Sequence, residues 1–332
     1  MTIVVLGANQ PADRFYRGGA RIDAFRGSPV GPDRRPEDWI GSATALAGQD
    51  RLGLSVLPDG RLLSDAVESD PLSWLGAAHV AAFGSATMLL VKLLDAGQRL
   101  PVHAHPDDAF SRAVLHRPVG KAEAWYILEG GDVHLGLAQS VSRESLAQLV
   151  REQDTRALLD LLHTRSVAPG DVVFVPQGEL HAIGEGVFLL ELQQPEDLSI
   201  LLEWSGFELD GEADGHLGIG FERALDAVRT LATTPAELDA LVMPAGQGSS
   251  VLPVASHPFF RLARWTDPAG VSLEPGFAIV VVEEGAVVVT PETGPAVPLR
   301  RGETAAVAHA SGRVRFDGEG TVLICRPPDP RG

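Results

Sequence analysis

Two segments of the chain carry histidines in patterns that could bind a metal ion. In VHAHPDD, His103 and His105 are two residues apart, so on a strand both imidazoles project from the same face. An isolated pair of this kind is just as often two histidines on a polar strand face. The second segment, GDVVFVPQGELH, predicts a strand, a tight Pro-Gly turn and a returning strand that carries His181 inward. The two segments together indicate three imidazoles around one ion.

An acidic residue from the following strand is expected to complete the site. Glu123 lies in AEAWYIL two positions before Trp125, so both side chains can face inward while Tyr126 faces out. Asp107 and Asp108 directly follow a proline and are better interpreted as turn or helix-cap residues. The sequence therefore predicts one divalent metal ion per chain, with the ligands His103, His105, Glu123 and His181.

The elements that must position these ligands are mostly short strands. The runs QRLPVHAH, AEAWYILEG and DVHLGL fall between residues 98 and 137, and DVVFVP and VFLLELQQ follow, so we expect an antiparallel barrel. Leucines and Val150 recur at helical spacing between Ser142 and Leu162, which predicts an α-helical insertion in that barrel. Further helices are expected at residues 70–84 and at roughly 217–243.

The chain is expected to form two barrel-like halves. Residues 1–60 indicate strands and loops without a long helix, and the glycine-rich AGQGSS at 245–250 indicates a linker. Regularly spaced short strands follow the linker. We therefore expect a metal-binding unit over 1–244, with N-terminal strands and the helical insertion, and a second barrel over 252–332.

Composition and charge exclude several classes of partner. The chain has 332 residues, with 27 Lys and Arg against 44 Asp and Glu, and the resulting charge of −17 repels nucleic acid and anionic membrane surfaces. No apolar run is long enough to span a membrane, and the apolar start lacks the basic flank of a signal peptide. Cys325 is the single cysteine and cannot form an intramolecular disulfide. We expect a cytoplasmic protein with a small-molecule partner.

These motifs resemble the type I mannose-6-phosphate isomerases, which are zinc-dependent double cupins with a helical insertion. The matching stretches include FYRGGARIDAF, PEDWIGS, HAHPDDAF, GKAEAWYILEG and FVPQGELHAIGEGVFLLELQQPEDLS, and they extend over nearly the whole chain. The resemblance implies a mainly β fold of two cupin barrels, or jelly rolls. It also implies that residues 252–332 form a degenerate cupin without metal ligands.

The resemblance also assigns site residues. The family's zinc ligands fall on His103, His105, Glu123 and His181, with histidine at 103 where the family usually has glutamine. Three imidazoles and a carboxylate suit zinc, and also iron, manganese or nickel. The family's active-site residues match Lys92, Lys121, Glu191 and Asp197. The alternatives are that Lys92 only extends from a barrel rim, that Lys121 is solvated in a turn, and that Glu191 supports a metal ligand.

Two departures from the family bear on the substrate. Pro101 stands where the family has a serine, and it cannot donate a hydrogen bond to a substrate oxygen. Leu201 stands where the family has an arginine implicated in catalysis. A leucine cannot bind phosphate or stabilise an enediolate. Either another cation supplies the charge, with Lys92, Arg112 and Arg117 as the first candidates, or the substrate differs.

The function implied by the resemblance is a metal-dependent aldose–ketose isomerase that interconverts mannose 6-phosphate and fructose 6-phosphate. Glu191 is a candidate base and Lys121 could stabilise negative charge, while a metal-bound water and His103 are alternative bases. Two other functions stay open: an isomerase or epimerase of an unphosphorylated sugar, and a sugar-binding cupin without catalysis. A redox cupin is disfavoured, because nothing outside the ligand set supports it.

Overall fold

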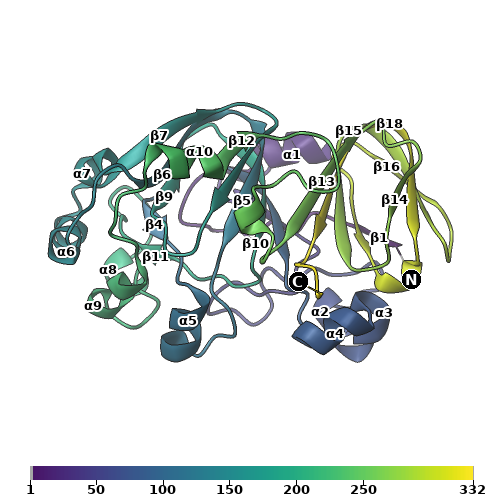
Figure 1. Ribbon diagram of the computed structural model, residues 1–332, viewed down its shortest axis with the longest axis horizontal. Helices are drawn as coiled ribbons and strands as arrows, with labels where there is room; N and C mark the ends of the chain where they lie inside the picture. The colour runs from purple at the N-terminus through teal and green to yellow at the C-terminus, as the bar shows by residue number, and fades with distance from the viewer. Residues whose placement is uncertain (1–2, 332) are drawn as a thin grey trace.

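The computed structural model describes residues 3–331, which form two β-structures lying side by side (Figure 1). The larger half contains the segments that carry the predicted ligands, and the smaller half is built mostly from residues after 260. The mainly β fold class expected from the sequence is confirmed.

The larger half is a barrel made from two antiparallel sheets. The first sheet has the strand order β12 (Val242–Pro244), β8 (Asp171–Val175), β5 (Glu123–Glu129), β10 (Phe188–Gln193), β3 (Leu90–Asp95) and β2 (Glu37–Ile40). The second has the order β11 (Ile200–Leu201), β4 (His103–Ala104), β9 (His181–Ile183), β6 (Gly131–Leu137) and β7 (Leu162–Val167). β3 and β10 are buried along their whole length. Their near-continuous apolar sequences follow from burial of both faces.

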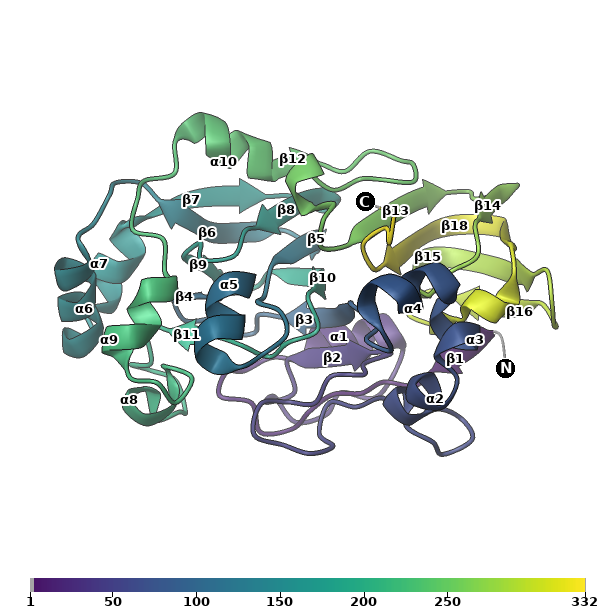
Figure 2. The ribbon, with the colours of Figure 1, turned by 60° about the horizontal axis from the view of Figure 1, so that its bottom comes forward.

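Helices cover the outer side of the second sheet. The predicted insertion consists of two helices between β6 and β7, α6 (Arg143–Glu152) and α7 (Thr155–Asp160). The break follows Gln153, which adopts a left-handed φ of 51°, and the Asp154 side chain then caps α7 by accepting from the Ala157 amide. Leu146 and Leu158 bury the apolar sides of the two helices. Figure 2 shows them at the end of the molecule away from the smaller half.

Short helices also line the remaining loops of the larger half. α8 (Gly211–Asp214), α9 (Phe221–Ala224) and α10 (Pro235–Leu241) lie in the second expected helical region, and α5 (Asp108–Phe110) follows the histidine pair. A loop separates α9 from α10 within the helical segment expected over 217–243. α10 begins at a capping box formed by Thr234 and Glu237. Asp107 caps α5 by accepting from the Phe110 amide, as its place after proline predicted.

The first 84 residues contain more helix than expected. α1 (Ala20–Arg26) lies in the region interpreted as strands and loops, and α2 (Leu63–Ser69), α3 (Pro71–Leu75) and α4 (Ala77–Phe83) follow. The single helix expected at 70–84 is divided at Gly76, which has a φ of 88°. A Cβ at this position would lie 2.6 Å from the His309 ring, so the close approach of the second half requires glycine.

The smaller half is one curled sheet of seven strands. It contains β13 (Arg261–Thr266), β14 (Val271–Leu273), β15 (Ala278–Pro291), β16 (Val297–Arg300), β17 (Thr304–Val307), β18 (Val314–Arg326) and β1 (Ile3–Leu6). β1 pairs with β17, so the first strand completes the smaller half and lies outside the 1–244 unit to which the sequence assigned it. The division of the chain near 245–250 otherwise stays a prediction.

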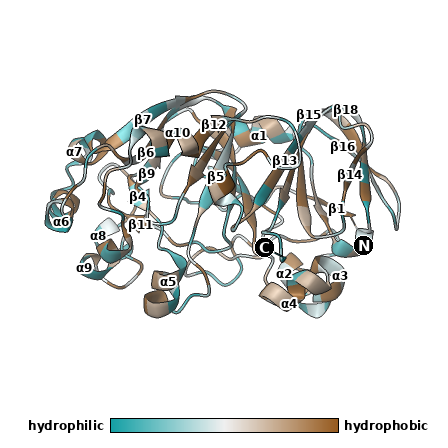
Figure 3. Ribbon diagram, viewed as in Figure 1, coloured by the Kyte–Doolittle hydropathy of each residue, from teal (hydrophilic) through white to brown (hydrophobic). Residues whose placement is uncertain are grey.

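Both faces of the first half of β15 are buried. Along β15, Val280 and Val282 pack in the interior of the sheet, while Ile279 and Val281 belong to the core shared with the larger half. Tyr126 faces out of the first barrel, as expected, and its hydroxyl lies 2.9 Å from a Glu283 oxygen in the smaller half. Figure 3 shows apolar residues along the strands of both halves. Within residues 3–331, no helix is long and apolar enough to cross a membrane.

Candidate metal centre

The three predicted histidines meet inside the larger barrel. His103 on β4 is the direct cross-strand neighbour of His181 on β9, and His105 is the first residue after β4. The rings of His103 and His181 lie 4.0 Å apart between centroids, and that of His105 lies 5.1 and 4.9 Å from them. One nitrogen from each imidazole lies within 4.8 Å of the other two, and all three residues are buried. A buried three-histidine group of this kind can hold a metal ion.

Each imidazole is oriented by a backbone carbonyl. Nδ1 of His103 donates to Pro101 O at 2.8 Å, Nδ1 of His105 to Leu198 O at 2.6 Å, and Nδ1 of His181 to Glu179 O at 2.9 Å. A carbonyl can only accept, so these contacts place the proton on Nδ1 and leave Nε2 free as a lone-pair donor. Pro101 therefore contributes to the centre through its backbone oxygen.

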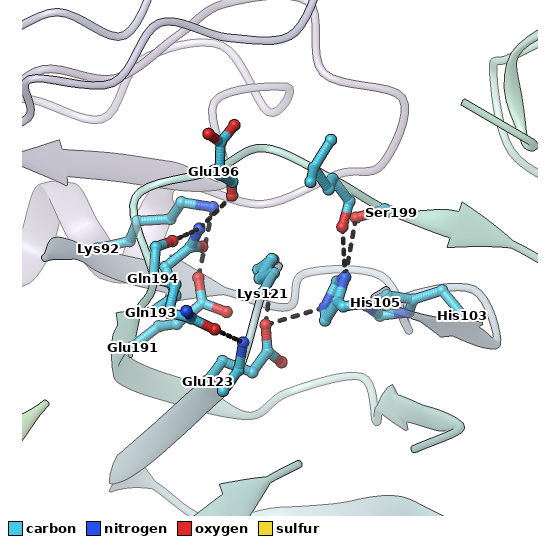
Figure 4. A network of polar contacts seen from close by, with 12 residues as sticks. Lys92, His103, His105, Lys121, Glu123, Glu191, Gln193, Gln194, Glu196 and Ser199 are labelled. Carbon is cyan, nitrogen blue, oxygen red and sulfur yellow. Dashed lines mark hydrogen bonds and ion pairs between the residues drawn. The ribbon is translucent and has the colours of Figure 1, made fainter. Parts of the chain in front are cut away.

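Glu123 faces two of these nitrogens. Its Oε2 lies 3.0 Å from His105 Nε2, and its Oε1 lies 3.2 Å from His181 Nε2 (Figure 4 shows the first contact). Among the described residues, His105 Nε2, His181 Nε2 and Glu123 Oε2 are nevertheless buried without a hydrogen bond of good geometry, although Lys121 Nζ also lies 3.0 Å from Glu123 Oε2. Buried polar atoms that converge without bonding to each other fit an ion that would bind all of them.

Burial and neighbouring charges keep the ligand groups in the forms that bind a metal. Burial, together with His181 and His105, holds the pKa of His103 well below its usual range. Burial and the Lys121 ammonium lower the pKa of His105 to about 3. Burial alone would raise the pKa of Glu123, but Lys121 and His105 hold it well below its usual range. Neutral imidazoles beside a carboxylate are the donor set that a divalent ion requires.

Lys121 and Trp125 hold the Glu123 side chain. Lys121 Nζ lies 3.0 Å from Glu123 Oε2, and Trp125 Nε1 donates to Glu123 Oε1 at 3.0 Å. Glu123 and Trp125 both face the barrel interior because they are two residues apart on β5. Lys121 is 5% exposed, so the alternative of a solvated turn residue is wrong.

A row of charged side chains continues from the ligands across the first sheet. Glu191 on β10 is paired in register with Lys92 on β3, and Lys92 with Trp39 on β2. Lys92 Nζ lies 3.4 Å from Glu191, 3.5 Å from Glu37 and 4.6 Å from the centre of the Trp39 ring (Figure 4 shows Lys92 and Glu191). Lys92 is 4% exposed and does not extend from a rim.

The charges in this row have perturbed pKa values. Burial would lower the pKa of Lys92, but Glu191 and Glu37 raise it above its usual range, so Lys92 is charged. Burial, opposed by Lys92 and reinforced by the nearby Glu123, raises the pKa of Glu191 to about 7. A carboxyl group with a pKa near neutrality can accept and release protons under ordinary conditions.

Four residues of the N-terminal segment belong to the same network and were not assigned from the sequence. Glu37 Oε1 accepts from Tyr16 Oη at 2.7 Å and from Arg14 Nε at 3.2 Å, while its Oε2 accepts from Trp39 Nε1 at 2.7 Å. Glu37 and Trp39 lie in PEDWIGS, and Tyr16 lies in FYRGGARIDAF. Those stretches carried the family resemblance, but nothing in them indicated which side chains face the centre.

The centre opens onto a narrow cleft of about 50 Å³. The polar residues that line it are Arg14, Tyr16, Glu37, Lys92, His103, Lys121, Glu123, Glu191, Asp197 and Ser199. Leu201, the cross-strand neighbour of His103, and Pro101 also line it. Asp197 lies at the edge, where its Oδ2 accepts from the Ala47 amide at 2.9 Å. Six of the eight site residues predicted from the sequence therefore line the cleft, and the other two, His105 and His181, lie next to His103.

Two of the cations suggested as replacements for an arginine at 201 do not reach this cleft. Arg112 is 57% exposed and lies 3.7 Å from Asp108, and Arg117 is 52% exposed and paired with Glu196. Neither residue lines the cleft. Arg14 is the arginine that does, and it comes from a loop far away in sequence.

Known proteins that are similar in sequence to this chain share the name mannose-6-phosphate isomerase. No family model matches the chain. Mannose-6-phosphate isomerase of Streptococcus mutans is 28% identical over 321 residues, which cover 92% of this chain and 93% of that protein. Mannose-6-phosphate isomerase ManA of Bacillus subtilis is 31% identical over 197 residues, or 57% of each chain.

Solved structures show the same fold. Mannose 6-phosphate isomerase of Bacillus subtilis superposes with a TM-score of 0.71 at 21% identity, covering 98% of this chain and all of that one. A variant of phosphomannose isomerase from Salmonella typhimurium superposes with a TM-score of 0.75 at 17% identity, covering 99% of this chain and all of that one. The double-cupin architecture is thereby supported over the full length of the chain.

Proposed function

The chain belongs to the mannose-6-phosphate isomerase family, and on that premise we propose that it is a metal-dependent aldose–ketose isomerase that interconverts mannose 6-phosphate and fructose 6-phosphate. The observation that carries the proposal is the junction of a three-histidine centre with a cleft that contains a carboxyl group of near-neutral pKa, Glu191. Metal-assisted isomerisation uses a Lewis acid and a base next to the same two carbon atoms.

His103, His105, Glu123 and His181 would hold the ion. When bound there, a divalent cation polarises the carbonyl oxygen and the neighbouring hydroxyl oxygen of the sugar. His103 is the ligand histidine that lines the cleft, so substrate oxygens would approach from its side. Zinc as the native ion and the cytoplasm as the location stay predictions.

The chain's own residues supply the proton transfer. We assign Glu191 as the base that moves a proton between carbon 1 and carbon 2, because it lines the cleft and its pKa of about 7 leaves it partly unprotonated at neutral pH. Lys121 lines the cleft beside Glu123 and would stabilise negative charge that develops on a substrate oxygen. Lys92 holds Glu191 in place through their ion pair, and Asp197 fixes the loop at Ala47 beside the cleft.

A specific observation favours a second candidate, an isomerase or epimerase of an unphosphorylated sugar. Leu201 and Pro101 present apolar surface to the cleft where the family carries an arginine and a serine. A neutral sugar would need neither group. A sugar-binding protein without catalysis would have the same cleft, and it differs from both enzymes in giving no product.

Product formation separates these functions. Zinc-loaded protein would be incubated with mannose 6-phosphate, free mannose and other aldoses, and ketose would be followed by NMR. We expect fructose 6-phosphate from mannose 6-phosphate and none from protein stripped of metal. Ketose from free mannose alone would establish the second candidate, and binding without any product would contradict both enzymatic proposals.

A further inference from the structure

The charges that line the cleft are unequally neutralised. Lys121 faces Glu123 at 3.0 Å, and Lys92 lies between Glu37 and Glu191, with both carboxylates within 3.5 Å. Lys92 is therefore engaged by two of the protein's own anions, and Lys121 lies against the expected metal ligand Glu123, where the reacting oxygens of a substrate would lie. Since the chain as a whole carries a charge of −17, an anionic ligand could enter only where a local cation has donors to spare.

Arg14 is such a cation. Its Nε donates to Glu37 at 3.2 Å, while within residues 3–331 neither of its terminal nitrogens has a hydrogen-bond partner. Its side chain is 14% exposed, so the guanidinium is mostly enclosed, and the exposed part borders the cleft. A fixed guanidinium whose two terminal NH2 groups are free can donate to two oxygens of a phosphate group.

The backbone around Arg14 is held in place. Asp13 adopts a left-handed φ of 57°, a conformation that aspartate tolerates better than most residues. The Arg14 amide then donates to Arg34 O at 3.2 Å, and Arg34 Nε donates to Arg14 O at 2.7 Å. Arg14 is thus positioned before any ligand binds, which lowers the entropy cost of binding.

We propose that Arg14 binds the anionic group of the substrate and makes the cleft selective for a phosphorylated aldose over a neutral one. The inference rests on the proposed function and adds the residue that determines its substrate class. Three ion-pair contacts, through Glu37, Lys92 and Glu191, separate Arg14 from the neighbourhood of the metal ligand Glu123. That separation suits a sugar whose reacting carbons lie at the centre and whose phosphate lies at its far end.

Arg14 also accounts for the loss of a cation at position 201. Leu201 and Arg14 line the same cleft but come from different parts of the chain, β11 and the loop before α1. An anion can be bound by a guanidinium from either side of a cleft, because the interaction depends on local geometry and not on chain position. The apolar Leu201 is therefore compatible with a phosphorylated substrate.

The test uses variants of the metal-loaded, full-length protein. Arg14→Gln removes the charge and keeps an N–H that can donate to Glu37, and Arg14→Lys keeps the charge without the planar fork. Arg112→Gln is the matched control, because Arg112 is exposed and does not line the cleft. Binding of mannose 6-phosphate and of free mannose would be measured by titration calorimetry, together with metal content and with KM and kcat.

We expect Arg14→Gln to weaken mannose 6-phosphate binding roughly ten- to hundredfold, the usual effect of losing a charge-assisted contact. Free mannose binding and metal content should not change, and the loss should fall mainly on KM because the phosphate stays distant from the reacting carbons. Arg14→Lys should lie between wild type and Arg14→Gln, and Arg112→Gln should match wild type.

Three results would overturn the inference: wild-type affinity for mannose 6-phosphate in Arg14→Gln, an equal loss for free mannose, or a wild-type protein that does not prefer the phosphorylated sugar. Arg14-dependent binding without turnover would support the inference while refuting the proposed isomerase. Adding Leu201→Arg to Arg14→Gln should restore part of the affinity, because it returns a guanidinium to the same cleft. The double variant also shows that a loss in Arg14→Gln did not come from misfolding.

Discussion

Lys92→Met is expected to destabilise the metal-free protein by an amount that grows with pH. Methionine keeps an unbranched apolar stem against Trp39, but it removes the ammonium that lies 3.4 Å from Glu191 and 3.5 Å from Glu37. Glu37 retains hydrogen bonds from Arg14, Tyr16 and Trp39, so the loss of its contact with Lys92 should lower the free energy of unfolding by only about 1 kcal/mol. Glu191 loses the lysine that forms its ion pair.

The pH dependence follows from the pKa of Glu191. Its usual value is 4.5, and in the folded wild type it is about 7, so the folded state binds the proton more tightly than the unfolded state does. The stability that this tighter proton binding gives to the folded wild type is therefore lost as the pH rises from 4.5 to about 7, and it changes little above that range. Without Lys92 the pKa of Glu191 rises further, and the loss continues above pH 7 at roughly 1 to 1.5 kcal/mol per pH unit.

Urea unfolding at pH 6 and pH 9, on protein stripped of metal, measures the difference. We expect Lys92→Met to lose about 1 kcal/mol at pH 6 and roughly 2 to 3 kcal/mol more at pH 9. In the background of Glu191→Gln, which lacks the titrating carboxyl, adding Lys92→Met should cause the same loss at both pH values. An equal loss at pH 6 and pH 9 in the single variant would refute the assignment of a buried, Lys92-dependent carboxyl to Glu191.

Three further predictions concern the metal centre and its chemistry. His181→Ala should purify folded but nearly free of metal, because its metal affinity should fall by more than the ~10–100-fold that loss of an outer partner costs. His134→Ala, which lies outside the centre, should bind metal as wild type does, and elemental analysis checks both. Wild type should retain one equivalent of metal, because the interior of the smaller half is packed with apolar side chains, and a second equivalent within 252–332 would contradict this. With saturating metal, activity should fall on the acid side as Glu191 becomes protonated, and Glu191→Gln should lose both the activity and that limb of the pH profile; an unchanged profile would point to another base.

The metal centre was predictable because its information is local. His103 and His105 share a strand face through their spacing, and the Pro-Gly turn before His181 returns a third imidazole to the same interior. Glu123 was identified by the same alternation on β5. The extents of helices were less predictable. α6 and α7 are separated at Gln153, and α3 and α4 at Gly76, where packing against other parts of the chain overrides helical periodicity.

Sequence alone predicted the mainly β fold class and the four expected ligands, because strand alternation and turn chemistry act over a few residues. The lysines and carboxylates of the neighbouring strands were predicted from the family resemblance. Only the tertiary structure decided which distant groups meet them. β1 joins the far sheet through backbone pairing with β17, and no side-chain pattern in either strand specifies that partner. Arg14 reaches the cleft because Asp13 turns the chain and Glu37 holds the guanidinium. Such contacts depend on the three-dimensional path of the backbone, which spacing along the chain does not encode.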